Sequence, residues 1–496
     1  MRTSDALDPR PMSLPQLLGR QNEAFTNTII KGMQLDSRKV RPGDLFLALP
    51  GEQHDGRQFI EQAVANGAAA VLAEAPVAGF LDAISVPLIE LPELRLEAGL
   101  LAARFYGNPS RSMRVLGITG TNGKTTTSSI VAQLIRSLGK PCGVIGTLGA
   151  TLADEVTDAS NTTPDALSLQ RQLAQWLEQD IHAVSMEVSS HALEQGRVNG
   201  VAFETAVYTN LSHDHLDYHG SMEAYGRAKQ RLFTVDGLRH AVINMDDPFG
   251  ASVKAAVAAD VQVLTYSVGG ASADVRIENT EFHRDGVRGD LQTPWGTATF
   301  FSPLPGDFNL ANLAASVTAL MLGGEELGSV LSAAASLQPV PGRMQLLPTT
   351  LDIQVIVDYA HTPHALEQAL KALRPHVTGS LVTVFGCGGD RDRQKRQQMG
   401  SIACALSDRV VVTSDNPRTE NPQCIMHDIE SGCSGHYMLR VDRADAISAA
   451  VAAAQAGDCV FIAGKGHECY QLVDEQRLPF SDAAHARDAL TRRAAS

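Results

Sequence analysis

The feature of this sequence that most constrains its fold is an apolar run that leads directly into a glycine-rich turn. Residues 114–119 read Arg-Val-Leu-Gly-Ile-Thr, and residues 120–126 read Gly-Thr-Asn-Gly-Lys-Thr-Thr. Glycines let backbone N–H groups approach phosphate oxygens closely, and the first turn of a helix adds a favourable dipole. The lysine would neutralise terminal phosphates, and the hydroxyl after it would bind Mg²⁺. The segment therefore predicts a strand, a phosphate-binding loop and a helix.

The spacing of this loop departs from the general phosphate-loop pattern. That pattern has a glycine five positions before Gly123, where this chain has Ile118. An ordinary glycine-rich strand-to-helix turn is the alternative interpretation. The residues predicted to contact a nucleoside triphosphate are Gly120, Thr121, Asn122, Gly123, Lys124, Thr125 and Thr126.

Length and composition indicate a globular chain of several domains. The 496 residues predict about three domains, and 44% hydrophobic residues supply ample material for their cores. The 41 basic and 55 acidic residues give a net charge of −14, which argues against a nucleic-acid partner. No signal peptide or transmembrane run is present, so we expect a cytoplasmic protein without a membrane partner. The seven scattered cysteines predict neither a disulfide framework nor a zinc site.

Two segments rich in proline and glycine, at 106–110 and 338–343, divide the chain into predicted domains at 1–109, 110–341 and 342–496. In the central domain, short apolar strands alternate with helices, which predicts a mostly parallel sheet covered on both faces. Residues 273–303 interrupt this alternation and are expected to form antiparallel strands. The predicted strands are 114–119, 181–188, 205–209 and 241–244, and the predicted helices are 125–138, 221–233, 309–321 and 325–336.

The C-terminal domain repeats the alternation of strands and helices. Ligands of such a sheet bind beyond the carboxyl ends of its strands, and here a polar sequence follows each predicted strand. These polar sequences begin at Asp358, Gly386, Asp415 and Gly464. The predicted strands are 353–358, 381–386, 409–413 and 458–463, and the predicted helices are 363–373, 393–405 and 444–454.

Two side chains of the central domain, the carboxylate of Glu187 and the imidazole of His215, suit a metal ion. Glu187 ends an apolar strand and offers the hard oxygen that Mg²⁺ prefers, although a surface acid is the alternative. His215 lies in a segment dense in His and Asp and could complete the Mg²⁺ shell. A catalytic zinc site, or a helix entry with Asp214 as its N-cap, are the other interpretations of that segment.

Two further segments have equally open interpretations. Asn-Thr-Thr-Pro at 161–164 caps a helix, or it presents hydroxyls to an anionic substrate together with Ser189, Gln195 and Arg197. Asp-Asn-Pro-Arg at 415–418 forms a plain turn, or it holds a zwitterion with its guanidinium on a carboxylate. Lys229 by itself reads as part of a solvated basic helix face.

Together and in this order, these segments resemble the Mur ligase family across essentially the whole chain. The Gly-Thr-Asn-Gly-Lys-Thr-Thr loop is similar to that of Mur ligases and folylpolyglutamate synthases, which are ATP-dependent enzymes that form amide bonds on a carboxylate. The resemblance implies a smaller α/β N-terminal domain for a UDP group, a central phosphate-loop ATPase, and a Rossmann-like C-terminal domain. It implies an ADP-forming acid–amino-acid ligase of peptidoglycan precursor synthesis, with ATP and Mg²⁺.

The resemblance also implies roles for individual residues. The UDP group would be contacted by Leu35, Ser37, Glu52, Gln53 and His54. The muramoyl dipeptide would be held by Thr162, Thr163, Ser189, Gln195 and Arg197. Further nucleotide contacts would come from Asn309, Asn312, Arg343 and Asp358, with Phe308 standing where many members have His. Catalytic roles fall on Lys124, Glu187, His215 and Lys229, and metal ligation on Thr125, Glu187, His215 and a carbamylated Lys229.

The amine donor would be bound by Arg391, Asp415, Asn416, Pro417, Arg418, Gly464 and Glu468. The sequence 415–418 reads like that of family members that add meso-diaminopimelate. The implied partners are therefore UDP-N-acetylmuramoyl-L-Ala-D-Glu and meso-diaminopimelate, bound by a monomer. The alternatives are a ligase that adds lysine, a folylpolyglutamate synthase, and an ATP-gated regulatory protein without turnover.

Overall fold

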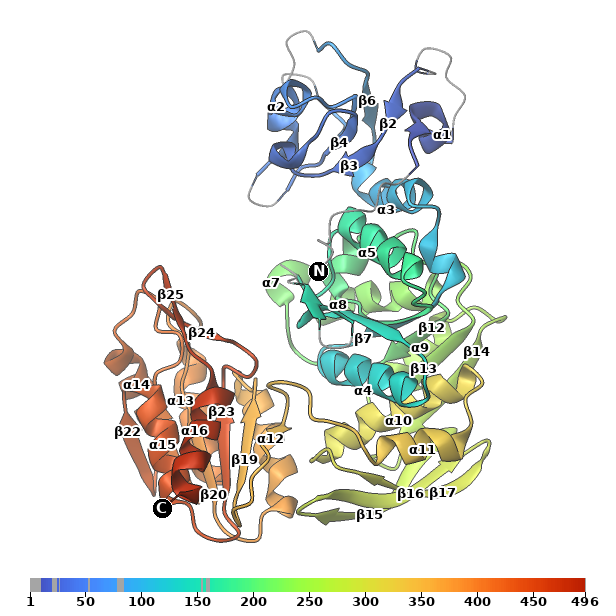
Figure 1. The fold of residues 1–496 in the computed structure, drawn as a ribbon. Coiled ribbons are helices and arrows are strands. Elements are labelled where there is room, and N and C mark those ends of the chain that lie inside the picture. The colour runs from blue at the N-terminus through green and yellow to red at the C-terminus, as the bar shows by residue number, and fades with distance from the viewer. Residues whose placement is uncertain are drawn as a thin grey trace. The chain divides into compact units, whose positions relative to one another are not determined.

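The computed structural model describes residues 10–19, 25, 27–51, 54–77, 84–152, 155–157 and 161–495. Their contacts group the chain into two compact units. Figure 1 shows the helices and strands as a ribbon coloured by residue number. The first unit contains Met1–Asp274 and Ala315–Glu325, and the second contains Val275–Ala314 and Glu326–Ser496. This grouping assigns residues 275–314 to the C-terminal unit, so the predicted domain boundaries at 109/110 and 341/342 stay a prediction.

The N-terminal part of the first unit is a small parallel sheet. Its strand order is β3 (Gly32–Gln34), β4 (Asp44–Ala48), β5 (Ala70–Glu74) and β6 (Leu88–Leu91). Alternate residues of β4 enter different cores: Leu45 and Leu47 pack with α1 (Leu14–Leu18) and α3 (Leu94–Phe105), while Phe46 packs with α2 (Ile60–Ala65). A strand apolar on both faces is what a doubly covered parallel sheet requires. The chain before β3 forms a short antiparallel pair of strands, β1 (Met12–Ser13) and β2 (Ile29–Ile30).

The central part of the first unit has the predicted alternation of strands and helices. Parallel strands run in the order β8 (Cys142–Gly146), β11 (Ala183–Glu187), β7 (Arg114–Thr119), β12 (Thr205–Tyr208), β13 (His240–Asn244) and β14 (Gln262–Ser267). β9 (Gly149–Leu152) and β10 (Glu155–Thr157) extend it antiparallel beyond β8. The helices are α4 (Lys124–Ser137), α5 (Ala166–Glu178), α6 (Ser190–Glu194), α7 (Leu216–His219), α8 (Met222–Gln230) and α9 (Gly250–Ala256).

Residues 275–303 of the second unit form the predicted antiparallel strands β15 (Val275–His283), β16 (Gly286–Thr293) and β17 (Gly296–Ser302). The helices α10 (Asp307–Leu322) and α11 (Leu327–Ala334) follow them. His376 ties this segment to the C-terminal domain: its Nε2 accepts from Gly306 N at 3.0 Å, and its Nδ1 lies 2.7 Å from His283 O. The imidazole is 3% exposed, and burial lowers its pKa. The neutral imidazole of His376 therefore joins the two segments through a hydrogen bond at each ring nitrogen.

The C-terminal sheet is parallel apart from β18 (Gln345–Leu346). Its order continues with β19 (Gln354–Asp358), β23 (Cys459–Ala463), β20 (Leu381–Phe385), β21 (Arg409–Thr413) and β22 (Tyr437–Arg440). One face packs on α12 (Pro363–Leu373), α13 (Gln394–Leu406) and α14 (Pro422–Glu430), and the other on α15 (Arg443–Ala453) and α16 (Asp482–Ala494). The predicted doubly wound fold is confirmed; α14, α16, β22 and the hairpin β24 (Tyr470–Val473) and β25 (Gln476–Pro479) were not predicted.

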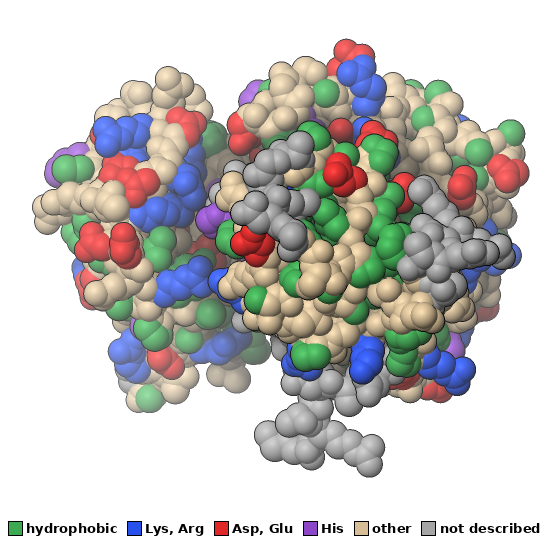
Figure 2. Space-filling model, turned by 90° about the horizontal axis from the view of Figure 1, so that it is seen from above, with side chains coloured by type: hydrophobic (Ala, Val, Ile, Leu, Met, Phe, Trp, Pro, Cys, Tyr) green, Lys and Arg blue, Asp and Glu red, His purple; other side chains and the backbone are tan. Residues whose placement is uncertain are grey.

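Acidic and basic side chains are interspersed on the face of the molecule that Figure 2 shows. Among the described residues, no helix is both long enough and apolar enough to cross a membrane.

A buried ion pair joins the carboxyl ends of two C-terminal strands. Arg443 donates to both oxygens of Asp482 at 2.7 Å, and neither side chain is exposed. The same guanidinium donates to Ala463 O at 2.9 Å and to Ser414 O at 3.3 Å. These carbonyls precede the polar sequences at 415 and 464, so Arg443 holds the starting points of both.

We predict that Asp482→Asn destabilises the second unit by about 3–5 kcal/mol, because it leaves a buried guanidinium without its counter-charge. The free energy of unfolding from urea titrations measures this change. Asp445→Asn is the matched control, since Asp445 pairs with Arg440 at the surface, where such a pair contributes about 0–1 kcal/mol. Equal losses in the two variants would contradict the assigned role of Arg443.

Candidate functional site

The phosphate-binding loop predicted from the sequence connects β7 to α4. Gly120 has a φ of 149° and Gly123 a φ of 84°, values that favour glycine, and the helix begins at Lys124. Lys124 Nζ donates to Gly120 O and Thr121 O, each at 2.8 Å. The ammonium group therefore bends back over the loop at the start of the helix, where the backbone favours an anion.

A second lysine reaches the same loop from α8. Lys229 is 1% exposed, and its Nζ donates to Gly120 O at 2.8 Å and lies 4.1 Å from the centre of the Tyr225 ring. The interpretation of Lys229 as part of a solvated helix face is therefore wrong. Burial, and then the charge of Lys124, hold the pKa of Lys229 well below its usual range. Two amino groups thus share one backbone oxygen, and the buried one is driven toward its neutral form.

Glu187 places a carboxylate beside the first turn of α4. It is 1% exposed, so the surface-acid interpretation is wrong. Its Oε2 accepts from Thr125 Oγ1 at 3.0 Å, and its Oε1 accepts from Thr147 N at 2.8 Å. A buried carboxylate and a hydroxyl next to a phosphate-binding loop are the hard oxygen donors that Mg²⁺ requires, so these residues fit that ion.

The residues predicted to hold the dipeptide gather around the end of β11. Thr163 Oγ1 donates to Glu187 O at 2.9 Å and accepts from Ser189 N at 3.0 Å. Arg197 donates to Thr163 O at 3.1 Å and to Gln195 Oε1 at 2.8 Å. Thr162 approaches the hydroxyl of Thr147 at 3.2 Å. These polar groups therefore lie together next to Glu187.

The segment 161–164 does not cap a helix. The N-cap of α5 is Asp165, whose carboxylate accepts from Leu167 N and Ser168 N. The helix-cap interpretation of Thr162 and Thr163 is therefore wrong by two or three residues, and their hydroxyls bond to other parts of the site instead.

His215 stands at the start of α7 with a φ of 53°. Its side chain is 47% exposed, lies 3.4 Å from Asp214 Oδ2 and packs edge-on against His191 with ring centres 4.9 Å apart. His215 itself is the N-cap of α7, so the proposed cap at Asp214 is wrong. Among the described residues, no group of three or more His, Cys, Asp and Glu side chains is placed to hold a metal ion.

The further nucleotide contacts predicted from the sequence form two separate pairs in the second unit. Asn309 and Asn312 are buried, and Asn312 Nδ2 donates to Asn309 Oδ1 at 3.1 Å. Asp358 accepts backbone N–H bonds of 2.7 and 2.8 Å, and burial raises its pKa. Arg343 lies over the ring of Tyr359, 4.5 Å from its centre.

The described residues among those predicted for the UDP group, Leu35, Ser37 and His54, follow the strands β3 and β4 of the first unit. Leu35 packs against the core, and Ser37 Oγ donates to Gln62 Oε1 at 2.7 Å. His54 is exposed and its carbonyl accepts from Gly51 N at 2.9 Å. Glu52 and Gln53 lie outside the described residues.

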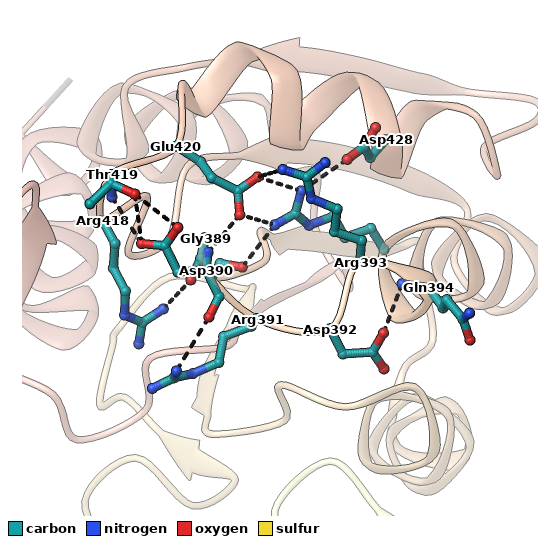
Figure 3. A network of polar contacts seen from close by, with 12 residues as sticks. Gly389, Asp390, Arg391, Asp392, Arg393, Gln394, Arg418, Thr419, Glu420 and Asp428 are labelled. Carbon is teal, nitrogen blue, oxygen red and sulfur yellow. Dashed lines mark hydrogen bonds and ion pairs between the residues drawn. The ribbon is translucent and has the colours of Figure 1, made fainter.

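Two guanidinium groups flank the carboxyl ends of β20 and β21. Arg418 has a φ of 53° and donates to Gly389 O at 2.6 Å, and the exposed Arg391 donates to Asp390 O at 3.3 Å. Figure 3 shows both guanidinium groups on the side of the loop away from Glu420. Such a pair suits a ligand that carries carboxylates.

Acidic and amide groups lie in the segments that begin at 415 and 464. Asn416 Nδ2 donates to Glu468 Oε2 at 2.9 Å, and Asp415 is 7% exposed. Gly464 has a φ of 119°, and a Cβ there would lie 2.6 Å from Asp415 Oδ2. The structure therefore brings the segments at 415 and 464 together, as the strand ends of a parallel sheet predict.

Sequence analysis missed the residues that support this site. Arg396 on α13 is 1% exposed and donates to Glu420 at 2.8 and 3.0 Å and to Asp428 at 2.9 Å. Glu420 Oε1 in turn accepts from Asp390 N at 2.6 Å, as Figure 3 shows. Arg396 lies among other charged residues of a predicted helix, and that pattern is typical of a solvated surface.

Comparison with known proteins identifies the class to which this fold and site belong. The model named Mur ligase family, catalytic domain, matches residues 29–106; Mur ligase middle domain matches 118–320; and Mur ligase, glutamate ligase domain, matches 342–466. The chain belongs to the Mur ligase family, and the resemblance seen in its sequence is confirmed.

Individual relatives match nearly the whole chain. The UDP-N-acetylmuramoyl-L-alanyl-D-glutamate–2,6-diaminopimelate ligase of Coxiella burnetii is 46% identical over 484 residues, which cover 96% of this chain and 99% of the relative. The protein of the same name from Pseudomonas aeruginosa is 48% identical over 482 residues, or 97% and 98% of the two chains. A solved structure with this name is 40% identical, has a TM-score of 0.77 and covers 98% of this chain and 99% of its own.

We predict that Glu420 makes the stability of the second unit depend on acid pH. Hydrogen bonds from Arg396 lower the pKa of Glu420 from 4.5 to about 2. This stabilisation is therefore complete above about pH 4.5 and is lost as the pH falls toward 2, for a total of about 2–3 kcal/mol. Glu420→Gln should remove this part of the pH dependence, measured by urea unfolding at about pH 6 and about pH 3.5.

The control for this prediction is Glu367→Gln. Lys371 also lowers the pKa of Glu367, but that pair lies exposed on α12, where an ion pair contributes little. A wild-type pH dependence that survives in Glu420→Gln would show that other carboxylates produce it.

Proposed function

We propose that this protein is an ATP-dependent ligase that adds meso-diaminopimelate to the γ-carboxylate of D-Glu in UDP-N-acetylmuramoyl-L-Ala-D-Glu. It acts as a monomer in the cytoplasm. The observation that carries the proposal is the set of polar groups that follow the strand ends of the second unit: the guanidinium groups of Arg418 and Arg391, and the amide of Asn416 bonded to the carboxylate of Glu468. Guanidinium groups bind carboxylates and Glu468 can bind an ammonium, which suits a donor with amino-acid groups at both ends. The relatives named for this reaction support the same substrate.

The reaction must first convert the D-Glu carboxylate into an acyl group with a good leaving group. The γ-carboxylate attacks the terminal phosphorus of ATP, which gives an acyl phosphate and ADP. Lys124 and the loop N–H groups offset the charge that gathers on the transferred phosphoryl oxygens. The neutral amine of the donor then attacks the acyl carbon, the C–O bond to phosphate breaks, and the amine loses a proton.

The residues near the loop divide this work. Arg197, with Gln195 and the hydroxyl groups at the end of β11, would hold and orient the anionic dipeptide. Glu187 and Thr125, with His215 and a modified Lys229, would hold Mg²⁺. When bound, this ion neutralises phosphate charge and polarises the bond that breaks.

Lys229 is suited to carbamylation by its burial. A neutral amine can attack CO₂: the N–C bond forms, the nitrogen loses a proton, and a carbamate anion results. The low pKa of Lys229 supports the neutral form, and the carbamate would replace one of two crowded cations with an oxygen ligand. The modification therefore suits both the electrostatics of the loop and the proposed metal site.

The proposal is tested by phosphate release from ATP in the presence of UDP-N-acetylmuramoyl-L-Ala-D-Glu, with meso-diaminopimelate, L-lysine or no amine. We expect release that depends on meso-diaminopimelate and a tripeptide product of matching amount. Release with lysine alone would instead assign the chain to the lysine-adding ligases. Release with a folate and glutamate would favour a folylpolyglutamate synthase, and ATP binding without any turnover would favour a regulatory protein. Lys124→Ala is the control that should abolish release.

We predict that Arg418→Ala raises the KM for meso-diaminopimelate by about 10–100-fold, because a charge-assisted hydrogen bond is worth roughly 1.5–3 kcal/mol. The KM for ATP should change far less, because the phosphate-binding loop consists of residues 120–126 and does not include Arg418. Steady-state kinetics with each substrate varied in turn measures both constants. Equal increases in the two KM values would contradict a role in amine binding.

We predict that Lys229 carries a carbamate at neutral pH. Protein equilibrated with ¹³C-labelled bicarbonate should show one carbamate carbon resonance that Lys229→Ala lacks. Acidification should release the label, because protonation of the carbamate nitrogen returns CO₂ and an amine. Lys254→Ala, at a surface position of α9, should retain the resonance. An identical spectrum for wild type and Lys229→Ala would exclude the modification.

A further inference from the structure

Lys465 is a fully buried cation in the middle of the predicted amine-donor site. It follows Gly464, where the chain leaves β23, and it is 0% exposed. Its Nζ donates to Asn416 Oδ1 at 2.8 Å and to Glu468 Oε2 at 2.9 Å. Sequence analysis gave the residues on both sides of it a role in binding the donor and gave Lys465 none. A buried ammonium is costly unless it is paired, so these two bonds must be part of the folded site.

The first bond fixes the orientation of the Asn416 amide. Asn416 Oδ1 accepts from Lys465 Nζ and also from Leu472 N at 2.9 Å. Because two donors face this oxygen, the amide nitrogen must point the other way, and there it donates to Glu468 Oε2 at 2.9 Å. Without Lys465, the amide oxygen would keep only the bond from Leu472 N, and Glu468, which accepts from the amide nitrogen, would lose its own bond to the ammonium group.

The second bond anchors one carboxylate oxygen of Glu468. The bonds from Lys465 and Asn416 both use Oε2, and neither uses Oε1. One carboxylate oxygen therefore anchors Glu468 to the protein, and the other is left to accept from an ammonium group.

We propose that Lys465 is a positioning residue for the amine donor: it orients Asn416 and anchors Glu468 by one oxygen, so that the other oxygen can bind the donor's ammonium group. This inference rests on the proposed function and deepens it, because it explains how the site would bind the amino group of the donor as well as its carboxylates. Lys465 does not contact the donor. Its effect on catalysis passes through Asn416 and Glu468.

The test is the kinetics of Lys465→Met, which keeps much of the side-chain length and removes the charge. The KM for meso-diaminopimelate should rise by about 10–100-fold, as expected for the loss of a charge-assisted contact, with the KM for ATP within about twofold of wild type. Lys371→Met is the matched control, since Lys371 lies in the same unit on an exposed face of α12. An unchanged KM for meso-diaminopimelate in folded Lys465→Met would overturn the proposal.

A double-mutant cycle separates positioning from general stabilisation. If Lys465 acts through Glu468, then Lys465→Met should have a much smaller effect on the KM for meso-diaminopimelate in a Glu468→Gln background than in wild type. Effects that simply multiply would show that Lys465 acts independently of Glu468 and would overturn the proposal. Lys465→Gln, which keeps a hydrogen-bond donor, provides the same cycle if the methionine variant does not fold.

The two proposals fail in different ways. If wild-type protein releases no phosphate with meso-diaminopimelate, the proposed function fails. If wild type uses meso-diaminopimelate normally and the cycle shows no coupling, only the role of Lys465 fails.

Discussion

Two lysine side chains donate to one backbone oxygen, and much of the central site depends on that constraint. Lys124 and Lys229 both reach Gly120 O, from the start of α4 and from the interior of α8. Two positive charges that contact the same oxygen repel each other strongly where water is excluded. The loop therefore tolerates this arrangement only if one amine stays neutral or an anion arrives, and Lys229, which is nearly inaccessible to water, is the one whose charge is suppressed. In the proposed function, a triphosphate would neutralise the charge of Lys124, and a carbamate would replace the amino group of Lys229 with an anion.

In the C-terminal site, by contrast, each buried cationic side chain is already paired with a carboxylate of the protein. Arg443 is neutralised by Asp482, Arg396 by Glu420 and Lys465 by Glu468. Each of these cations also binds a carbonyl or amide of the loops that follow the strands. The parallel sheet brings the loops to one edge, and the paired cations fix them there. Loops that are fixed in this way can present side chains to a ligand at little further cost in conformational entropy.

The sequence predicted most of the fold because short apolar strands and capped helices leave local signals. β7 and α12 have the predicted bounds, and the interruption at 273–303 is the antiparallel segment β15–β17. Local patterns could not show that residues 275–314 group with the C-terminal unit, since His376 makes that connection across a long stretch of chain. The helix cap was missed because Asp165 competes with Thr162 and Thr163 for the same role.

The same distinction explains the site. The loop residues 120–126 and the strand-end segments were visible in the sequence because their spacing carries the chemistry. The burial of Lys229 was not visible, since charged neighbours on α8 suggested a solvated face, and only tertiary packing reverses that reading. Lys465 was overlooked between two residues with assigned roles, because its partner Asn416 comes from a different strand end.

The sharing of partners in the proposed amine site restricts how this protein could change its choice of amine donor over evolutionary time. Asn416 and Glu468 bind one another and the same lysine, while a side chain at Gly464 would press on Asp415. A single substitution that suits a different amine would disturb several of these bonds before it gained a new contact. Directed evolution toward another donor should therefore advance by exchanging the segments at 415–420 and 464–472 as one block, and libraries that vary one position at a time should stall.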